Sequence, residues 1–396
     1  MDRTALRNKY AIAGVGYTPQ GKVPGRSAAS FYLEASMNAI KDAGLRKEDI
    51  DGFILYRDFP ILKGDAFHHT ANVITKSLGI RPNFLSQESY CYRTFLHKAI
   101  GAIEAGACNY VLVVFAESGR TGHRTWTDEI DTFSDKPYAE YAAYGNISAF
   151  TNYAFFASRA MHEFGTGPDV WSEIAVAHRR WANLNPIANY YSKPLTKEDY
   201  MAAPCLAWPF RGVDATTSTD GRRAVIITTA ERAKELKNPL VTIRGFGVFN
   251  DTSKGWQLTP GDPRSSALIA GKLAYEMAGL SPKDIGAAQI YDCYTYTVEA
   301  TLADYGFYDR KKSRDFLTVE NIGPGGDFPV NTGGGLLAEG YYMGLTPLAE
   351  GVMQMSGRCG DRQLGVMPGT KLPEFMIISD NGGYYNSNET MILERG

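Results

Sequence analysis

The chain lacks most of the features that mark membrane, secreted and metal-binding proteins. Its 396 residues contain only five cysteines, which are scattered and never form a CxxC pair. This pattern argues against a disulfide framework and against a structural zinc site. No run of about 18 apolar residues occurs, so no segment is expected to span a membrane. The first ten residues lack the apolar region of a signal peptide. We therefore predict a cytoplasmic protein with no bound metal.

An excess of charge of one sign is also absent. Lys and Arg total 41 against 43 for Asp and Glu, so the formal net charge is -2. This balance provides no electrostatic footprint for nucleic acid, and no nucleic-acid partner is expected. Hydrophobic residues make up 44% of the chain. The length permits two cores, because single cores rarely grow beyond about 250–300 residues.

Helical and strand patterns alternate over most of the chain, which predicts an α/β layered fold. Strands are expected at 9–16 and 110–115, and helices at 27–43 and 92–105. Ser27 is suited to cap the first helix and Gly44 to end it. From 119 to about 214 the alternation gives way to aromatics, prolines and short helical pieces, which indicates an inserted loop region.

The second half of the chain repeats the pattern of the first. Ala43-Gly44-Leu45 recurs as Ala278-Gly279-Leu280, and in both copies a helix precedes and a strand follows. The repeat predicts two duplicated halves, 1–245 with the insertion and 246–396. Ligands in α/β sheets gather where strands end. We expect the loops before helix 92–105, after strand 287–291 and at 340–344 to meet.

A glycine-rich turn stands out within the second half. Three consecutive glycines at 333–335 precede a short helical run, which is followed by Gly340-Tyr341-Tyr342. Glycine adopts left-handed angles and lets other groups approach the backbone closely. We therefore expect a sharp turn that leads into a helix and places a tyrosine in a site.

The chain resembles the thiolase superfamily, and most of all its sterol-carrier-protein-type, or lipid-transfer-protein, thiolases. The resemblance covers nearly the whole chain and implies a thiolase fold, a duplicated αβαβα five-layer sandwich that is usually dimeric. It rests on Asp214 with the segment 219–221, and on the segments 291–295, 326–335, 340–344 and 380–383.

The positions that carry catalysis in thiolases differ here. Counting back from Gly106 by the family spacing leads to Ser89 instead of a cysteine, and Cys91 lies two residues further on. Tyr341 stands in place of the histidine of a Gly-His-Pro motif, and Tyr291 in place of an asparagine or histidine. A phenol can donate a hydrogen bond and, when ionised, accept a proton. The tyrosine pair resembles that of the steroid side-chain-cleaving aldolases.

This resemblance implies retro-aldol cleavage of a β-hydroxyacyl-CoA steroid of the 17-hydroxy-20-carboxyl-CoA type. The products would be a 17-ketosteroid and propionyl-CoA. It also implies a small zinc-ribbon/OB-fold partner, which forms a heterotetramer with a homodimer of this chain. No cofactor is expected in this chain, since CoA is part of the substrate.

The predicted catalytic residues are Tyr291, Tyr341 and Asp292. Asp292 either orients a tyrosine or binds backbone as a structural acid, and both remain open. Ser89 is suited to cap a helix, and it also stands where helix amides favour an oxyanion or carboxylate. The predicted substrate-binding residues are Ser89, Tyr294, Gly334, Gly335, Tyr342, Asn381 and Gly382.

Two other functions fit the sequence. One is a thiolase-type acyl-CoA acyltransferase that uses Cys91 or an unusual nucleophile, since thioester condensation needs an activated thiolate. The other is a non-catalytic subunit that binds lipid or acyl-CoA.

Overall fold

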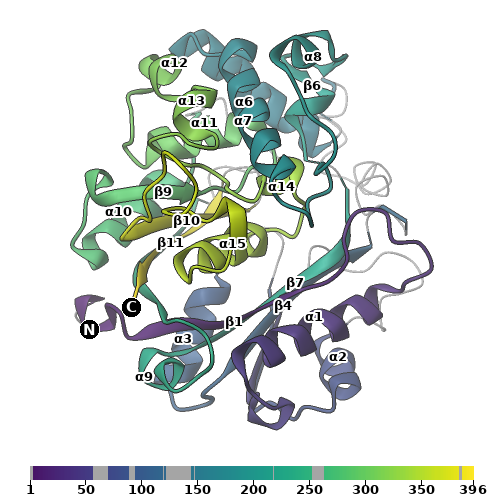
Figure 1. Cartoon of the computed structure of the whole chain (residues 1–396), viewed down its shortest axis with the longest axis vertical. Helices are drawn as coiled ribbons and strands as arrows, with labels where there is room; N and C mark the ends of the chain where they lie inside the picture. The colour runs from purple at the N-terminus through teal and green to yellow at the C-terminus, as the bar shows by residue number, and fades with distance from the viewer. Residues whose placement is uncertain are drawn as a thin grey trace.

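The computed structural model shows a layered α/β molecule with a helical cap (Figure 1). It describes residues 3–56, 70–88, 94–118, 120–121, 144–146, 148–216, 218–251, 263–382 and 386–396. Ser89 and Cys91, which the sequence singled out, lie outside these ranges.

The core is a nine-stranded sheet in the order β3-β2-β4-β7-β1-β8-β11-β10-β9. The two halves of this sheet meet at β1 and β8, where Ala11 pairs with Thr242. Each half has parallel strands at its outer edge and antiparallel strands toward the join. The strands are β1 (Tyr10–Tyr17), β2 (Gly52–Tyr56), β3 (Phe84–Glu88), β4 (Val111–Ser118), β7 (Asp220–Thr229), β8 (Val241–Asn250), β9 (Ile285–Gln289), β10 (Phe375–Gly382) and β11 (Ser387–Arg395).

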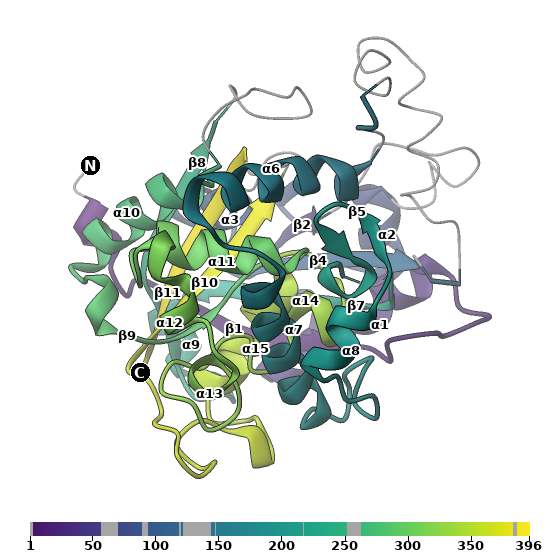
Figure 2. The same ribbon diagram turned by 90° about the horizontal axis from the view of Figure 1, so that it is seen from above.

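Helices cover these strands on both sides and fill the space between the halves. α1 and α2 pack on the N-terminal strands, and α10 packs on β8 and β11. α15 lies between the two sets of strands, in contact with β7 as well as β10 (Figures 1 and 2). This gives the five layers that the sequence predicted. The helices are α1 (Ala28–Ala43), α2 (Ala71–Leu78), α3 (Phe95–Glu104), α9 (Ala230–Lys234), α10 (Ala267–Ala278), α11 (Thr295–Asp304) and α15 (Leu345–Met355).

The duplication extends to the packing of single atoms. A Cβ on Gly16 of β1 would overlap the backbone of Ala35 in α1. In the second half, a Cβ on Gly247 of β8 would overlap Ala270 of α10 in the same way. Glycine on the strand and alanine on the helix therefore allow the same close approach in both halves.

The boundary predicted between residues 245 and 246 falls inside β8, which pairs with β11 of the C-terminal half.

The inserted region and the segment after α11 form the helical cap at one end of the molecule (Figure 1). α7 is central in it and packs against α11, α13 and α14. The cap places His178 of α7 beside Asp292, which lies just beyond the end of β9. Its elements are α6 (Ala149–Phe164), α7 (Pro168–Asn183), α8 (Lys197–Ala202), β5 (Cys205–Ala207), β6 (Phe210–Arg211), α12 (Ser313–Phe316), α13 (Val319–Ile322) and α14 (Gly335–Ala338).

Local signals predicted several element ends correctly. Ser27 caps α1 by accepting the Ser30 N–H, and Gly44 ends it with a φ of 76°.

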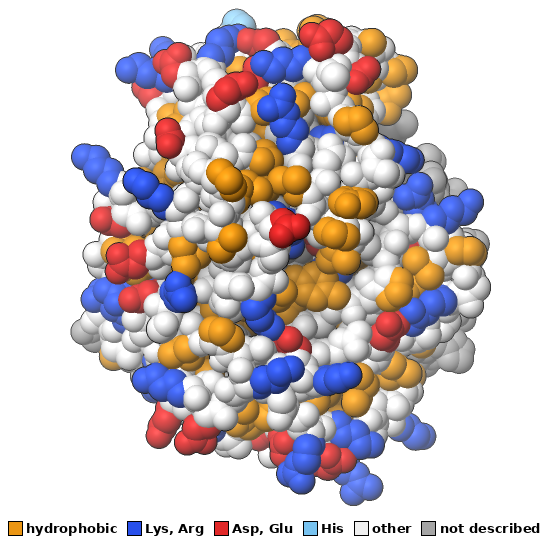
Figure 3. All heavy atoms as spheres, in the orientation of Figure 1, with side chains coloured by type: hydrophobic (Ala, Val, Ile, Leu, Met, Phe, Trp, Pro, Cys, Tyr) orange, Lys and Arg blue, Asp and Glu red, His pale blue; other side chains and the backbone are white. Residues whose placement is uncertain are grey.

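Acidic and basic side chains are interspersed on the face shown in Figure 3, in keeping with the balanced charge. Within the described ranges, no helix has the length and apolarity needed to cross a bilayer.

Candidate active site

Tyr291 lies two residues beyond the end of β9, on a backbone that is held from two sides. The side-chain amide of Asn331 accepts a hydrogen bond from the N–H of Ile290 at 2.6 Å and donates one to the carbonyl of Ile290 at 2.9 Å. The N–H of Tyr291 itself donates to Ser379 Oγ at 2.9 Å, which ties this loop to β10. These contacts fix the direction in which the Tyr291 side chain leaves the backbone.

Tyr341 lies in the turn between α14 and α15, where the sequence predicted a tyrosine to enter a site. Gly334 and Gly335 have φ angles of 106° and 64°, as expected for left-handed glycines that begin this segment. Just before Tyr341, Gly340 O accepts a hydrogen bond from Thr346 Oγ1 at 2.9 Å, and just after it the N–H of Tyr342 donates to the same Oγ1 at 3.1 Å. The turn is therefore bonded to α15 immediately before and after the tyrosine.

The two tyrosines converge, as expected for loops that meet where strands end. Their hydroxyl oxygens are 3.0 Å apart, and the rings meet edge to face at 74° with centroids 6.4 Å apart. The side chains are almost fully buried, at 4% exposure for Tyr291 and 2% for Tyr341. Two phenols at this distance share a hydrogen bond, so one can donate to the other whichever of them is ionised. This arrangement can hold a proton on either oxygen.

Comparisons with known proteins identify the family of the chain. The thiolase C-terminal domain-like family matches residues 259–395. The steroid side-chain-cleaving aldolase of Thermomonospora curvata is 32% identical, and the match covers 89% of this chain and 92% of that protein. The chain belongs to the aldolase branch of the thiolase superfamily. The 17-hydroxy-3-oxo-4-pregnene-20-carboxyl-CoA lyase of Mycobacterium tuberculosis is 29% identical, over 94% of this chain and 99% of that protein.

A solved structure described as an Ltp2-ChsH2(DUF35) aldolase superposes on this aldolase with a TM-score of 0.86. The sequences are 27% identical, and the superposition covers 98% of each chain. The human mitochondrial 3-ketoacyl-CoA thiolase in complex with CoA superposes with a TM-score of 0.66 at 15% identity, which supports the fold.

Asp292 adjoins Tyr291, but its carboxylate faces the cap. Oδ1 accepts the N–H of Leu336 at 2.7 Å, and Oδ2 accepts that of Leu337 at 3.3 Å. His178 Nδ1 of α7 lies 2.9 Å from Oδ2, and both side chains are fully buried. Asp292 therefore bonds the start of α14 and α7 to the loop that carries Tyr291. These contacts favour the structural alternative for this residue, and sequence reasoning did not identify His178 as its partner.

The glycines of the turn are surrounded by protein atoms. A Cβ on Gly334 would lie 2.7 Å from the Cβ of Ala182 in α7. A Cβ on Gly335 would overlap the carboxylate of Asp292. Both glycines are thus required for close packing of α14, and their predicted contact with substrate stays a prediction.

Tyr342 points away from its neighbour Tyr341. Its hydroxyl donates to the carbonyl of Asp220 at 3.0 Å, and the Arg223 guanidinium lies 4.6 Å from the centre of its ring. Burial raises the pKa of the Tyr342 phenol above its usual range. Of the two adjacent tyrosines, only Tyr341 therefore reaches Tyr291.

Tyr294 belongs to an aromatic cluster beside the pair. Its ring stacks on Phe210 with centroids 5.2 Å apart, and it contacts Tyr153 of α6 at 4.7 Å. Burial raises the pKa of the Tyr153 phenol, and Cys293 and Tyr291 raise it further. Asn381 and Gly382 are the last two residues of β10, the strand that also carries Ser379. They are buried, and their predicted role in binding substrate stays a prediction.

The first turn of α3 binds a carboxylate of the chain itself. The sequence placed Ser89 at a helix start, where backbone amides favour an oxyanion or a carboxylate, and Ser89 lies outside the described residues. α3 begins at Phe95, and Glu389 of β11 accepts the N–H groups of Leu96 and His97, each at 3.2 Å. A buried carboxylate of the chain itself therefore occupies the position that a helix N-terminus offers to an anion.

Three of the four described thiols are buried and poorly suited to nucleophilic chemistry. Burial raises the pKa of Cys293 to about 12 and that of Cys108 to about 11. Burial also raises the pKa of Cys359 well above its ordinary value. A thiolate is the reactive form, so these three side chains are expected to be inert at neutral pH.

A buried charge cluster lies behind the turn that carries Tyr341. Arg223 pairs with Glu339, and Arg362 pairs with Glu350. A Cβ on Gly333 would contact a carboxylate oxygen of both glutamates, so the two carboxylates lie close together. Burial raises the pKa of Glu339 from 4.5 to about 7, with a further contribution from Glu350 against the opposing effect of Arg223.

We expect this raised pKa to make folding pH-dependent. Folded Glu339 holds its proton more tightly than the unfolded chain between pH 4.5 and about 7. The free energy of unfolding should therefore fall as pH rises through this window. Glu339→Gln should lose this contribution, as measured by urea unfolding at pH 5, 6, 7 and 8. Glu276→Gln, at an exposed position of α10, is the matched control and should keep the wild-type slope. An unchanged slope in Glu339→Gln would contradict the assignment.

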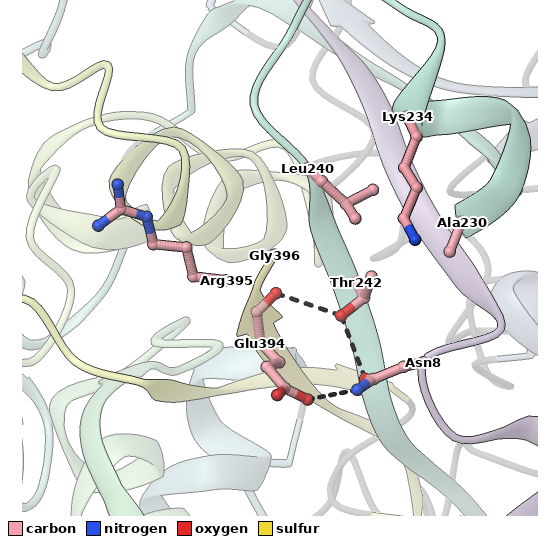
Figure 4. A pocket seen from close by; sticks show the side chains of 8 residues that line it. All are labelled: Asn8, Ala230, Lys234, Leu240, Thr242, Glu394, Arg395 and Gly396. Carbon is pink, nitrogen blue, oxygen red and sulfur yellow. Dashed lines mark hydrogen bonds between the residues drawn. The ribbon is translucent and has the colours of Figure 1, made fainter.

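A separate hollow of about 190 Å³ lies where the two chain ends meet β8 (Figure 4). Asn8 Nδ2 donates to Glu394 Oε2 at 2.6 Å, and Thr242 Oγ1 donates to Asn8 Oδ1 at 3.1 Å. None of its lining residues belongs to the tyrosine pair. Elsewhere in the described ranges, no group of three or more His, Cys, Asp or Glu side chains is placed to hold a metal ion.

Proposed function

We propose that this aldolase cleaves the side chain of a 17-hydroxy steroid carried as its 20-carboxyl-CoA thioester. The observation that carries the proposal is the 3.0 Å contact between the hydroxyls of Tyr291 and Tyr341. The names of the two relatives support the substrate class. The products are a 17-ketosteroid and propionyl-CoA.

The chemistry needs one proton removed and one proton supplied. One tyrosine, as phenolate, takes the proton of the 17-hydroxyl group. The C17–C20 bond then breaks, so that C17 becomes a ketone and the electron pair moves into the thioester enolate. The other tyrosine donates its proton to C20, which completes propionyl-CoA. General acid and base groups of this kind contribute roughly 10²–10⁴-fold each to the rate.

The short distance between the phenols also allows the two tyrosines to return to their starting protonation states. After one turnover the base is protonated and the acid is ionised, so the two tyrosines have exchanged states. A proton can then pass directly across the 3.0 Å between the two oxygens. The ionised phenol is stabilised throughout by the hydrogen bond from its neighbour. Net proton uptake from solvent is zero, which suits a pair that is buried.

The proposal includes a partner. The chain is proposed to work as a homodimer joined to a small zinc-ribbon/OB-fold protein in a heterotetramer. The superposed structure whose description names ChsH2(DUF35) together with Ltp2 supports a two-protein enzyme. The proposed reaction uses no cofactor bound by this chain, because CoA arrives with the substrate.

The test is a direct assay of the purified chain, alone and with the partner. We expect equal amounts of 17-ketosteroid and propionyl-CoA by mass spectrometry, and one deuterium at C2 of propionyl-CoA when the solvent is D₂O. The 17-deoxy analogue has no proton to give up and should remain intact. Failure to release ketone with the partner present would reject the proposal. Thiolysis of acetoacetyl-CoA instead would favour the acyltransferase.

A further inference from the structure

Met343 forms the third corner of a triangle with the two phenol hydroxyls. Its thioether sulfur lies 2.9 Å from Tyr341 Oη and 3.2 Å from Tyr291 Oη. The residue is 1% exposed, so the sulfur faces the hydroxyls in a place that bulk water does not reach. Both tyrosines therefore direct their hydroxyls toward the same sulfur atom.

The backbone at Met343 adopts a conformation that side-chain-bearing residues rarely take. Its φ is 53°, in the left-handed region that glycine enters readily. The residues on either side determine this turn. Tyr342 is held by Asp220 and Arg223, and a Cβ on Gly344 would overlap the side chain of Asp380. The turn is thus constrained at 342 and 344, and the residue between them directs its sulfur at the phenols.

A count of hydrogens shows what the sulfur can do there. While both phenols are neutral they carry two hydrogens, and a thioether carries none but accepts weakly. The three contacts of the triangle therefore share two hydrogens. When one phenol donates to the other, the second phenol is placed to donate to sulfur. Both directions of the Tyr291–Tyr341 hydrogen bond are accommodated without movement of heavy atoms.

We propose that Met343 is a positioning residue for the tyrosine pair: its thioether keeps both hydroxyls aimed at one point and, as a weak acceptor, gives up the hydrogen when a substrate oxygen arrives. This role rests on the proposed function. A stronger acceptor at the same place would compete with the substrate for the phenol hydrogens, and an apolar group would remove the sulfur atom that both hydroxyls contact.

Met343→Leu tests the role, because leucine nearly conserves the volume of methionine, is unbranched at Cβ and has no acceptor. We expect kcat for the steroid thioester to fall about tenfold, with KM within about twofold of wild type. The acid limb of the kcat–pH profile should move to lower pH, because the sulfur stabilises the neutral phenol. Met355→Leu, the same change at a buried position of α15, should match the wild type. If kcat instead fell equally at every pH, the variant would have lost only packing, and this result would overturn the proposal.

A second measurement does not depend on turnover. In protein labelled with ¹³C at the methionine methyls, Tyr341→Phe and Tyr291→Phe should each shift the Met343 resonance, and neither should shift that of Met355. Absence of ketone from the wild type would overturn the proposed function together with the role built on it, although the Met343 shifts would still occur. An active wild type whose Met343→Leu variant keeps both kcat and the pH profile would overturn the role of Met343 alone.

Discussion

Replacing either tyrosine of the pair by phenylalanine should lower kcat for the steroid thioester by roughly 10²–10⁴-fold. Each change removes only a hydroxyl, and the ring that packs against its partner at 6.4 Å remains. Folding should therefore persist, with a loss of about 0.5–1.5 kcal/mol for one hydrogen bond. Single-turnover ketone release and thermal unfolding of each variant measure the two effects separately.

The double variant is equally informative. Two groups that exchange one proton act as a unit, and the effects of such groups on rate do not add. Tyr291→Phe combined with Tyr341→Phe should therefore be little slower than the slower single variant. If the tyrosines instead filled space independently, each single variant would lower kcat only slightly, and the factor for the double variant would be the product of the two small factors.

Tyr342 provides the matched control. It adjoins Tyr341 and is as deeply buried, but its hydroxyl donates to the carbonyl of Asp220. Tyr342→Phe should lose a similar amount of stability and keep kcat within a few-fold of wild type. Near-normal turnover in both Tyr291→Phe and Tyr341→Phe would rule out the acid–base assignment.

The sequence predicted the fold and the tyrosine pair because the signals for both are local or repeated. The duplicated Ala-Gly-Leu segment predicted the two halves, and the ends of α1 follow from Ser27 and Gly44. Tyr291 and Tyr341 were singled out because the resemblance places them where thiolases carry an asparagine or histidine and the histidine of a Gly-His-Pro motif.

The contacts that the sequence did not predict join distant parts of the chain. His178 lies in the inserted region, more than a hundred residues before Asp292, and no motif connects them. Glu389 binds the first amides of α3 from the far end of the chain. Met343 was read as one residue of a motif, because the direction of its side chain depends on a left-handed φ that the sequence does not reveal.

For Asp292, the catalytic role predicted from the sequence and the contacts seen in the structure call for different experiments. Its place beside Tyr291 favoured catalysis, whereas its carboxylate binds two amides of α14 and His178. Asp292→Asn replaces one acceptor oxygen by a donor that faces other donors. We expect the free energy of unfolding to fall by about 3–5 kcal/mol, as for removal of one partner of a buried charged contact. Urea unfolding at constant pH measures this loss.

The matched variant for this contact is His178→Gln, which changes the other partner and leaves the loop of Tyr291 untouched. Because Asp292 and His178 share one contact, the double variant should lose less stability than the two single losses combined. Both single variants should lower kcat through a displaced turn, and the pH of half-maximal kcat should stay at its wild-type value. A shifted pH profile in Asp292→Asn alone, with His178→Gln fully active, would mean that the carboxylate polarises a tyrosine directly. In that case Asp292 would take part in catalysis, as the sequence first predicted.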